Sequence, residues 1–443
     1  MDIRESKISV LMFPWLAHGH ISPFLELAKK LSNRNFHIYL CSTPINLTSI
    51  KPKISQKYSL SIQLVELHLP SLPDLPPHYH TTKGLPPHLM STLKMAFHMS
   101  VPNFSNTLKT LNPNLLIYDI LQPWAPVVAS SYNIPAIQFL STGAAFTSFA
   151  DHLFKNTSVE FPFPSIYLHE YEKEKFNRLF ESSSNGVKDE DHVLGCRKES
   201  SKIVLIKTFR EIEVKYIDYL SVSIGKKMVP VGPLVQDPTD EDEPTDIIEW
   251  LDKKEKCSTV FVSFGSECFL SREEMEEVAN GLELSEVNFI WVIRFPVGEK
   301  IKVGDALPED FVKRIGERGL IVEGWAPQMR ILEHSSVGGF VSHCGWSSVM
   351  EGMKFGVPII AMPMQLDQPI NARLVEEVGV GVEVKRKEDG RLDRKEIAKR
   401  IRKVVVEKSG EDVRRNAREL SEKMKRKGDE EIDKVVQELL QVL

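Results

Sequence analysis

WAPQMRILEHSSVGGFVSHCGWSSVMEGMKFGVPIIAMPMQLDQ, residues 325–368, carries the strongest structural signal in the chain. Its two apolar runs, GGFVSH and VPIIAMP, are typical of short buried strands, and each leads into a polar turn that opens a helix. In the first turn, backbone N–H groups and hydroxyls converge where a strand ends and a helix begins, which favours an anion. The turn therefore suits a diphosphate, and the residues that would bind it are His343, Gly345, Ser347 and Ser348.

Polar and aromatic side chains flank this turn in an order that suits the other parts of a nucleotide sugar. Trp325 and Gln328 follow the predicted strand LIVEG, and they offer an indole face and an amide to a base. Glu351, in the helix after the turn, can accept a hydrogen bond from a ribose hydroxyl. Asp367 and Gln368 are two adjacent polar residues that suit sugar hydroxyls. The segment thus predicts successive sites for base, ribose, diphosphate and hexose.

The whole segment resembles the signature box of plant secondary-product UDP-glycosyltransferases. The resemblance implies the GT-B fold, in which two Rossmann-like α/β domains with parallel sheets face each other across a cleft. Ser347 stands where the family usually has Asn, and a serine hydroxyl reaches less far than that amide. The resemblance also implies how these residues bind a UDP-sugar. Trp325 would stack on uracil, Gln328 and Glu351 would bind the ribose, and His343 and Ser348 would bind phosphate. Asp367 and Gln368 would bind the sugar, with Ala326, Gly345 and Trp346 beside these groups.

Ordinary structural roles are the alternative for these residues. Taken singly, Trp325, His343 and Trp346 would each be interpreted as core or capping residues. Their occurrence together, in one ordered segment, favours the donor site.

Length and composition indicate the number of domains and the kinds of partner to expect. At 443 residues the chain exceeds what one hydrophobic core usually serves, so two domains are expected. A hydrophobic content of 42% and a net charge of −5 indicate neither nucleic acid nor an anionic membrane as a partner. The five cysteines form no CxxC pair, no apolar run nears the length of a membrane span, and no signal peptide is evident. We expect a cytoplasmic monomer that acts on small molecules.

The predicted boundary between the domains lies in LVQDPTDEDEPTD, which is acidic, contains prolines and has no periodicity. Residues 1–234 would form the acceptor-binding domain, 235–248 the linker and 249–428 the UDP-sugar-binding domain. By resemblance, the final helix at 429–443 packs back on the first domain. The linker's Asp240, Glu241 and Asp242 resemble a metal-binding DxD, but a linker provides no second shell to hold an ion.

His20 is the candidate general base. It lies between a predicted strand, SKISVLMF, and a predicted helix, HISPFLELAKKLS, in a turn with one glycine rather than the GxGxxG of nicotinamide-binding domains. The positive end of the helix dipole keeps such an imidazole neutral, so it can accept a proton. HGHISPF also resembles the family's catalytic loop, in which the histidine at this position deprotonates the acceptor hydroxyl. His18 is the second candidate.

Asp119 is the candidate partner of His20. It ends the buried strand in NLLIYDILQPWAP, so it lies on the edge of a parallel sheet where ligands bind. A carboxylate there would fix the imidazole tautomer and stabilise the imidazolium, whereas the alternative role is to cap the next helix. The resemblance favours the dyad. It also brings Thr142 near the donor glucose and Ser266 to the diphosphate.

No metal site is expected. His78, His80 and His88 alternate with prolines in a spacing that fits no compact ligand set. This proline-rich loop instead predicts a border of the acceptor cleft, and Tyr79, Trp124, Phe146 and Gln365 are candidates for lining it. Residues 155–197 are polar and irregular, and we expect them to form a variable cap that selects the acceptor.

These elements predict an inverting, metal-independent transferase that uses UDP-glucose as co-substrate. The stretches IQLVELHLPSLPDLPPHYHTTKGLPPHL and PMQLDQPINARLVEEVGVGVEVKR resemble the branch of the family that extends a sugar already attached to a small molecule. The acceptor would then be a plant glycoside. The alternatives are glucosylation of an aglycone hydroxyl, use of another UDP-sugar, and a non-catalytic binder of nucleotide sugars or glycosides.

Overall fold

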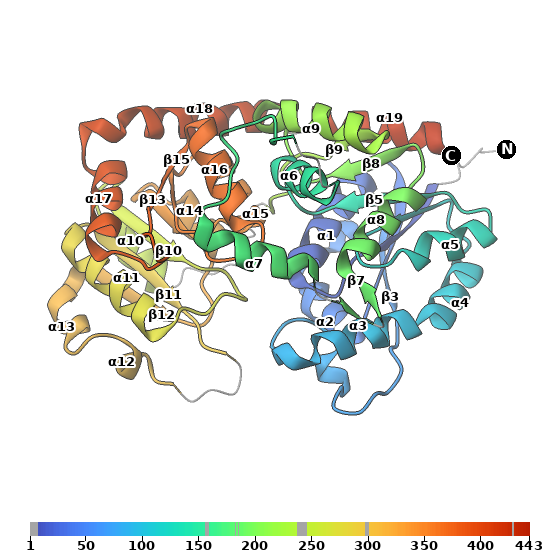
Figure 1. Ribbon diagram of the computed structural model, residues 1–443, viewed down its shortest axis with the longest axis horizontal. Coiled ribbons are helices and arrows are strands. Elements are labelled where there is room, and N and C mark those ends of the chain that lie inside the picture. The colour runs from blue at the N-terminus through green and yellow to red at the C-terminus, as the bar shows by residue number, and fades with distance from the viewer. Residues whose placement is uncertain are drawn as a thin grey trace. The chain divides into compact units, whose positions relative to one another are not determined.

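The computed structural model describes residues 8–155, 159–181, 183–184, 186–236, 246–296, 301–427 and 429–443. The chain forms two compact units, and each has its own parallel sheet (Figure 1). Because parallel strands need long crossover connections, helices alternate with the strands in both units. The first unit consists of Met1–Glu160, Asn177–Leu234 and Gly428–Leu443, and the second of Phe161–Phe176 and Val235–Lys427.

Seven parallel strands form the sheet of the first unit, in the order β3-β2-β1-β4-β5-β8-β9. The run SKISVLMF becomes β1 (Ile8–Phe13), which pairs with β2 and with β4. Since all the strands point the same way, their carboxyl ends share one edge of the sheet. The other strands are β2 (Phe36–Ser42), β3 (Ile62–Glu66), β4 (Leu115–Tyr118), β5 (Ala136–Leu140), β8 (Ile203–Ile206) and β9 (Lys227–Pro230).

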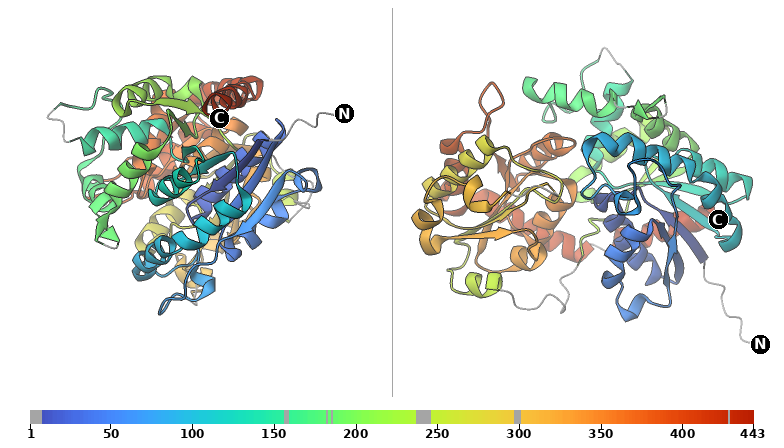
Figure 2. Two further views of the ribbon diagram at one scale, coloured as in Figure 1. Left: turned by 90° about the vertical axis from the view of Figure 1, so that its right-hand side faces the viewer. Right: turned by 90° about the horizontal axis from the view of Figure 1, so that it is seen from below.

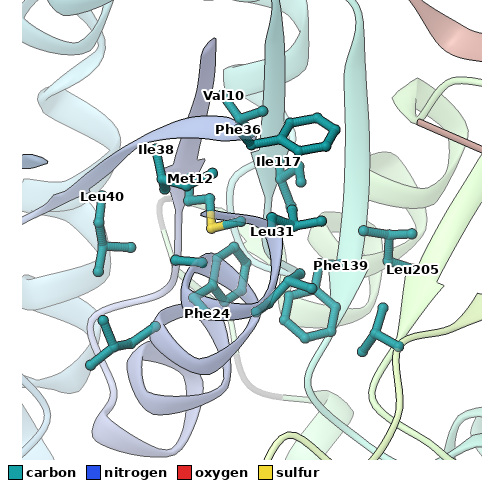
Figure 3. Packing of buried hydrophobic residues seen from close by; sticks show 14 of the residues in the cluster. Val10, Met12, Phe24, Leu31, Phe36, Ile38, Leu40, Ile117, Phe139 and Leu205 are labelled. Atoms are coloured by element: carbon teal, nitrogen blue, oxygen red, sulfur yellow. The ribbon is translucent and has the colours of Figure 1, made fainter. Parts of the chain in front are cut away.

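Apolar side chains fill both faces of this sheet, and helices cover both (Figure 2). Val10 and Met12 pack on one face with Phe24, as Figure 3 shows, while Leu11 and Phe13 point into the other cluster. Strand side chains alternate in direction, so a buried parallel strand is apolar at every position. The helices of this unit include α1 (His18–Ser32), α2 (Pro44–Ile50), α3 (Met90–Met99), α4 (Val101–Leu111), α5 (Trp124–Ser131), α6 (Ala144–Phe154), α8 (Asp189–Glu199) and α9 (Arg210–Ile224).

The last helix, α19 (Glu430–Val442), packs on the first unit. Ile432 and Val435 belong to the same apolar cluster as Val10. Arg34 donates a 2.6 Å hydrogen bond to Asp433, and Lys227 pairs with Glu438. The helix therefore combines an apolar inner stripe with ion pairs along its borders.

Six parallel strands form the sheet of the second unit, in the order β12-β11-β10-β13-β14-β15. They are β10 (Thr259–Ser263), β11 (Asn288–Ile293), β12 (Gly319–Glu323), β13 (Val337–Ser342), β14 (Ile359–Ala361) and β15 (Gly381–Glu383). The helices include α10 (Asp246–Asp252), α11 (Arg272–Ser285), α12 (Val303–Ala306), α13 (Phe311–Ile315), α14 (Gln328–Glu333), α15 (Trp346–Phe355), α16 (Gln368–Val378), α17 (Arg394–Val405) and α18 (Glu411–Lys427).

One segment before residue 234, the expected end of the first domain, belongs to the second unit. This segment, Phe161–Phe176, includes the start of α7 (Glu170–Glu181). Its buried Glu172 accepts two hydrogen bonds, of 2.8 and 2.9 Å, from Arg373 in α16. This long-range ion pair joins the segment to α16. Most of the predicted linker, with Asp240, Glu241 and Asp242, lies outside the described residues.

A helix needs about 20 mostly apolar residues to cross a bilayer. Within the described parts of the chain, no helix combines the length and the apolar character that crossing a membrane requires.

Candidate active site

His20 and Asp119 are hydrogen-bonded to each other in the first unit. His20 is the third residue of α1, and Asp119 directly follows β4, so the turn after β1 brings the two together. Nδ1 of His20 lies 2.8 Å from Oδ2 of Asp119. A carboxylate can only accept, so Nδ1 carries the hydrogen and Nε2 keeps its lone pair. That tautomer suits a general base.

The Asp119 carboxylate is held firmly. It is fully buried, and it also accepts hydrogen bonds from the backbone N–H groups of Trp15, at 3.0 Å, and Ile120, at 2.8 Å. Because the N–H donors come from the turns after β1 and β4, the backbone itself orients the carboxylate toward His20.

Ser141 is a neighbour of the dyad that the sequence did not single out. Its Oγ lies 3.1 Å from Nδ1 of His20, at the carboxyl end of β5. Serines are common in turns, so nothing in its sequence context marked it. Thr142, the next residue, places its Oγ1 3.0 Å from Oγ1 of Thr147 at the start of α6.

His18 has a different environment from His20. Its Nδ1 lies 3.0 Å from Oγ of Ser22, one turn along the same helix, and not at the carboxylate. Burial, with a smaller effect of the Lys53 charge, lowers the pKa of His18 to about 4. Of the two candidate bases, His20 has the partner that selects the basic tautomer.

Trp124 is partly buried and packs against the apolar core of the first unit. Its ring lies edge-on to Phe13, Phe97 and Phe104, with centroids 5.3 to 5.6 Å apart. These edge-on contacts fix the orientation of the partly buried ring.

In the second unit, the predicted donor residues gather where parallel strands end. Ser266 follows β10, Trp325 follows β12, and His343 follows β13. The sheet order places these three strands close together, with only β11 between β12 and β10. Trp325 is 67% exposed, so its indole face is open to a ligand.

His343 lies between two glycines that leave it room. A Cβ at Gly265 would approach its Nε2 to 2.7 Å, and one at Gly345 would approach to 2.6 Å. Any larger residue at either position would displace the ring. Burial, helped by the charge of Arg294, lowers the pKa of His343 to about 4, so the ring is neutral at pH 7. Its buried Nδ1 has no hydrogen-bond partner among the described residues, a cost that a ligand oxygen would remove.

The N-terminus of α15 follows directly. Gly345 is its N-cap, so no capping side chain of that residue competes with an anion for the first N–H groups. Trp346, Ser347 and Ser348 form the first turn, and the Trp346 ring is buried. This arrangement fits the diphosphate position that the sequence predicts.

Gln328 and Glu351 are brought together across two helices. Nε2 of Gln328, the first residue of α14, donates a 2.5 Å hydrogen bond to Oε2 of Glu351 in α15. The same nitrogen lies 3.4 Å from Oγ of Ser348. Ala326, which follows Trp325 in the sequence, is buried. The pair therefore forms one polar patch, as a shared ribose site requires.

Asp367 is the N-cap of α16 and Gln368 is its first residue, and hydrogen bonds hold both side chains. Oε1 of Gln368 accepts from the backbone N–H groups of Met364 and Gln365, each at 3.0 Å. Asn371 donates to Oδ2 of Asp367 at 2.8 Å. Because the Gln368 oxygen already accepts these two hydrogen bonds, the side chain would bind a sugar by donating from its NH₂ group.

Metal-ligating side chains do not cluster in the part of the chain that the structure describes. No group of three or more His, Cys, Asp or Glu residues there could hold an ion. His80 is buried, whereas His78 and His88 lie in separate short helical turns.

Sequence comparison places both units in known families. A profile described as "UDP-glucoronosyl and UDP-glucosyl transferase" matches residues 216–437, and one described as "Glycosyltransferase, N-terminal domain" matches residues 6–236. UDP-glucosyltransferase 29 of Panax ginseng is 59% identical, covering 100% of this chain and 98% of its own. The beta-D-glucosyl crocetin beta-1,6-glucosyltransferase of Gardenia jasminoides is 52% identical, with 98% of each chain covered.

Structure comparison agrees on the architecture. The structure of Phytolacca americana UGT2, complexed with UDP-2fluoro-glucose and pterostilbene, superposes with a TM-score of 0.79 at 28% identity and covers 98% of this chain and 99% of its own. The two parallel-sheet α/β units are therefore those of the GT-B fold. The chain belongs to the UDP-glycosyltransferase family and is a glycosyltransferase with a UDP-sugar as its co-substrate.

Proposed function

We propose that this enzyme transfers a glucosyl unit from UDP-glucose, with inversion, to a sugar hydroxyl of a small-molecule glycoside. The observation that carries the chemistry is the 2.8 Å hydrogen bond between His20 and Asp119, because it leaves Nε2 of His20 basic. The plant origin of the similar enzymes supports a role in secondary metabolism.

The reaction would proceed in one displacement. Nε2 of His20 takes the proton of the acceptor hydroxyl as its oxygen attacks C1 of the donor sugar, and the bond from C1 to the diphosphate oxygen breaks. Asp119 stabilises the imidazolium that forms. The electron pair of the broken bond leaves on UDP, where the turn at His343 and the N-terminus of α15 stabilise the charge. Attack from the face opposite the leaving group inverts C1. No step needs a metal ion.

The donor site would follow the order of the nucleotide sugar. Trp325, with Ala326, stacks on uracil, Gln328 and Glu351 bind the ribose, and Asp367 and Gln368 contact the sugar. The residues assigned to the diphosphate are Ser266, His343, Gly345, Trp346, Ser347 and Ser348, and Thr142 approaches the glucose from the first unit.

Glucose is the proposed sugar. The name of the Panax relative supports it, as does Gln368, which the family resemblance associates with glucose. Competition between UDP-glucose, UDP-galactose, UDP-xylose and UDP-rhamnose for one acceptor measures this preference. A higher kcat/KM with any of the other three would reject glucose as the donor sugar.

A glycoside is the proposed acceptor. The Gardenia relative is named for adding glucose to a glucosyl compound, and it aligns with nearly all of this chain. A site that binds a sugar by hydrogen bonds rejects the acceptor that lacks it, because buried polar groups are then left unpaired.

The decisive experiment compares mono- and diglucosides of terpenoids, apocarotenoids, lignans and flavonoids with their free aglycones. UDP-glucose is the donor, and product mass is the readout. We expect the glucosides to react much faster. Equal or faster reaction of the aglycones would reject the sugar-on-sugar assignment and leave a glucosyltransferase for aglycones.

A further inference from the structure

Arg294 lies among the donor residues but outside the segment that predicted them. It is the first residue after β11, the strand between β12 and β10. The turns after those two neighbouring strands carry Trp325 and Ser266. The guanidinium therefore originates at the same edge of the sheet as the proposed nucleotide site.

One nitrogen of Arg294 holds the turn that presents the indole. Its Nε donates a 2.8 Å hydrogen bond to the carbonyl oxygen of Gly324. Gly324 has a φ of +85°, a conformation that favours glycine, and it directly precedes Trp325. Arg294 thus connects the end of β11 to the start of the proposed base site.

No carboxylate of the described residues pairs with the positive charge of Arg294. Its two terminal nitrogens make no hydrogen bond with any of these residues. By contrast, Arg314 and Arg394 in the same unit each pair with a glutamate. Arg294 is half-buried, and burial lowers its pKa, so the unpaired charge carries a desolvation cost. An anionic ligand would remove this cost.

The position of the charge indicates which anion it meets. Arg294 contributes to the low pKa of His343, so its charge acts on the turn proposed to bind phosphate. Arg294 and Gly265 also line the same small cavity, and His343 packs on Gly265. A dianionic or trianionic group bound at this turn would lie in the field of the guanidinium.

We infer that Arg294 is a further donor-site residue, which binds the diphosphate of the nucleotide sugar through its terminal nitrogens while its Nε holds Gly324. The inference rests on the proposed donor site and adds a residue to it. Guanidinium groups form strong, charge-assisted hydrogen bonds with phosphate oxygens. The charge would also favour the departing UDP, on which negative charge develops as the bond to C1 breaks.

Comparing the binding of UDP with that of uridine separates the two roles of Arg294, which are to bind the diphosphate and to hold the turn at Gly324. Uridine keeps the base and ribose but lacks the diphosphate. In the enzyme, we expect Arg294→Gln to weaken UDP binding by about tenfold to a hundredfold and uridine binding by a clearly smaller factor, because uridine depends on Arg294 only through the turn at Gly324. Arg294→Lys keeps the charge and should lose less UDP affinity. Isothermal calorimetry measures all of these affinities without an acceptor.

Arg415→Gln is the matched control, because Arg415 is an exposed arginine of the same unit that pairs with Asp412 in α18. It should bind both ligands as the wild type does. Unchanged UDP affinity in Arg294→Gln would overturn the inference. Equal losses for UDP and uridine would also overturn it, since Arg294 would then act only through Gly324 and Trp325. Failure of the glycoside assay would leave these binding results intact, so the two proposals fail separately.

Discussion

At His20, one hydrogen bond decides which nitrogen can act. The carboxylate of Asp119 can only accept, so it fixes the hydrogen on Nδ1 and leaves Nε2 for the acceptor hydroxyl. The sequence could predict this pair, because the two residues follow the neighbouring parallel strands β1 and β4. It could not predict Ser141, whose approach to the ring depends on the exact path of the chain after β5.

Removing the imidazole should stop proton transfer but not donor binding. We expect His20→Ala to lower kcat by about a hundredfold to ten-thousandfold, with the UDP dissociation constant close to that of the wild type. Asp119→Asn should also lower kcat, because the imidazolium loses its counter-charge. His18→Ala is the control and should keep most of the turnover. Steady-state kinetics with UDP calorimetry tests this, and a His20→Ala enzyme with near-normal kcat would refute the base assignment.

The buried His343 should make stability depend on pH. Its pKa is lowered to about 4 in the folded protein from 6.5, so between these values the unfolded chain binds a proton that the folded chain does not. The free energy of unfolding should therefore fall as the pH falls from 6.5 to 4, by about 3 kcal/mol from this residue. His343→Gln should flatten that part of the profile in denaturant titrations. The exposed His88→Gln should not, and equal slopes in both variants would contradict the assignment.

Among the elements, those with a local signal were predictable from sequence. Ser271 is the N-cap of α11 and forms a capping box with Glu274, a spacing that can be recognised in the sequence alone. The association of Phe161–Phe176 with the second unit was not predictable. It depends on Glu172 and Arg373, which lie 201 positions apart and meet only in the folded chain.

The buried pair should matter far more than an exposed pair on the same helix. Arg373 contacts both Glu172 and Glu383, and its side chain is almost completely buried. Glu172→Gln would leave part of this buried charge uncompensated, so we expect a loss of about 3 kcal/mol in the free energy of unfolding. Glu170 pairs with Lys173 at 2.7 Å but is exposed, and Glu170→Gln should cost less than about 1 kcal/mol. Similar losses in the two variants would show that the buried pair does not stabilise the segment.

Over the whole molecule, the proposed chemistry is divided between the two units. The first unit contributes the dyad, and the second contributes the donor residues at the edge of its own sheet. The order proposed for the base, ribose, diphosphate and sugar residues comes from one continuous segment, so the sequence alone suggests it. Arg294 could not be included in that prediction, since it lies outside this segment, after β11, and its proposed role depends on a contact with Gly324.

The groups proposed to bind the diphosphate also predict how the enzyme should respond to a chelator. The charge of departing UDP would be met by groups of the chain itself, namely Arg294, the neutral His343 and the N-terminus of α15, so that no divalent cation needs to bridge the phosphates. Dialysis against EDTA should therefore leave kcat within about twofold of the untreated enzyme, and added Mg²⁺ should not raise it. The Arg294→Gln enzyme sharpens the test, because losing one cationic group would make any contribution of Mg²⁺ easier to detect. A loss of activity in EDTA that Mg²⁺ or Mn²⁺ restores would show that the protein groups alone do not stabilise the leaving diphosphate.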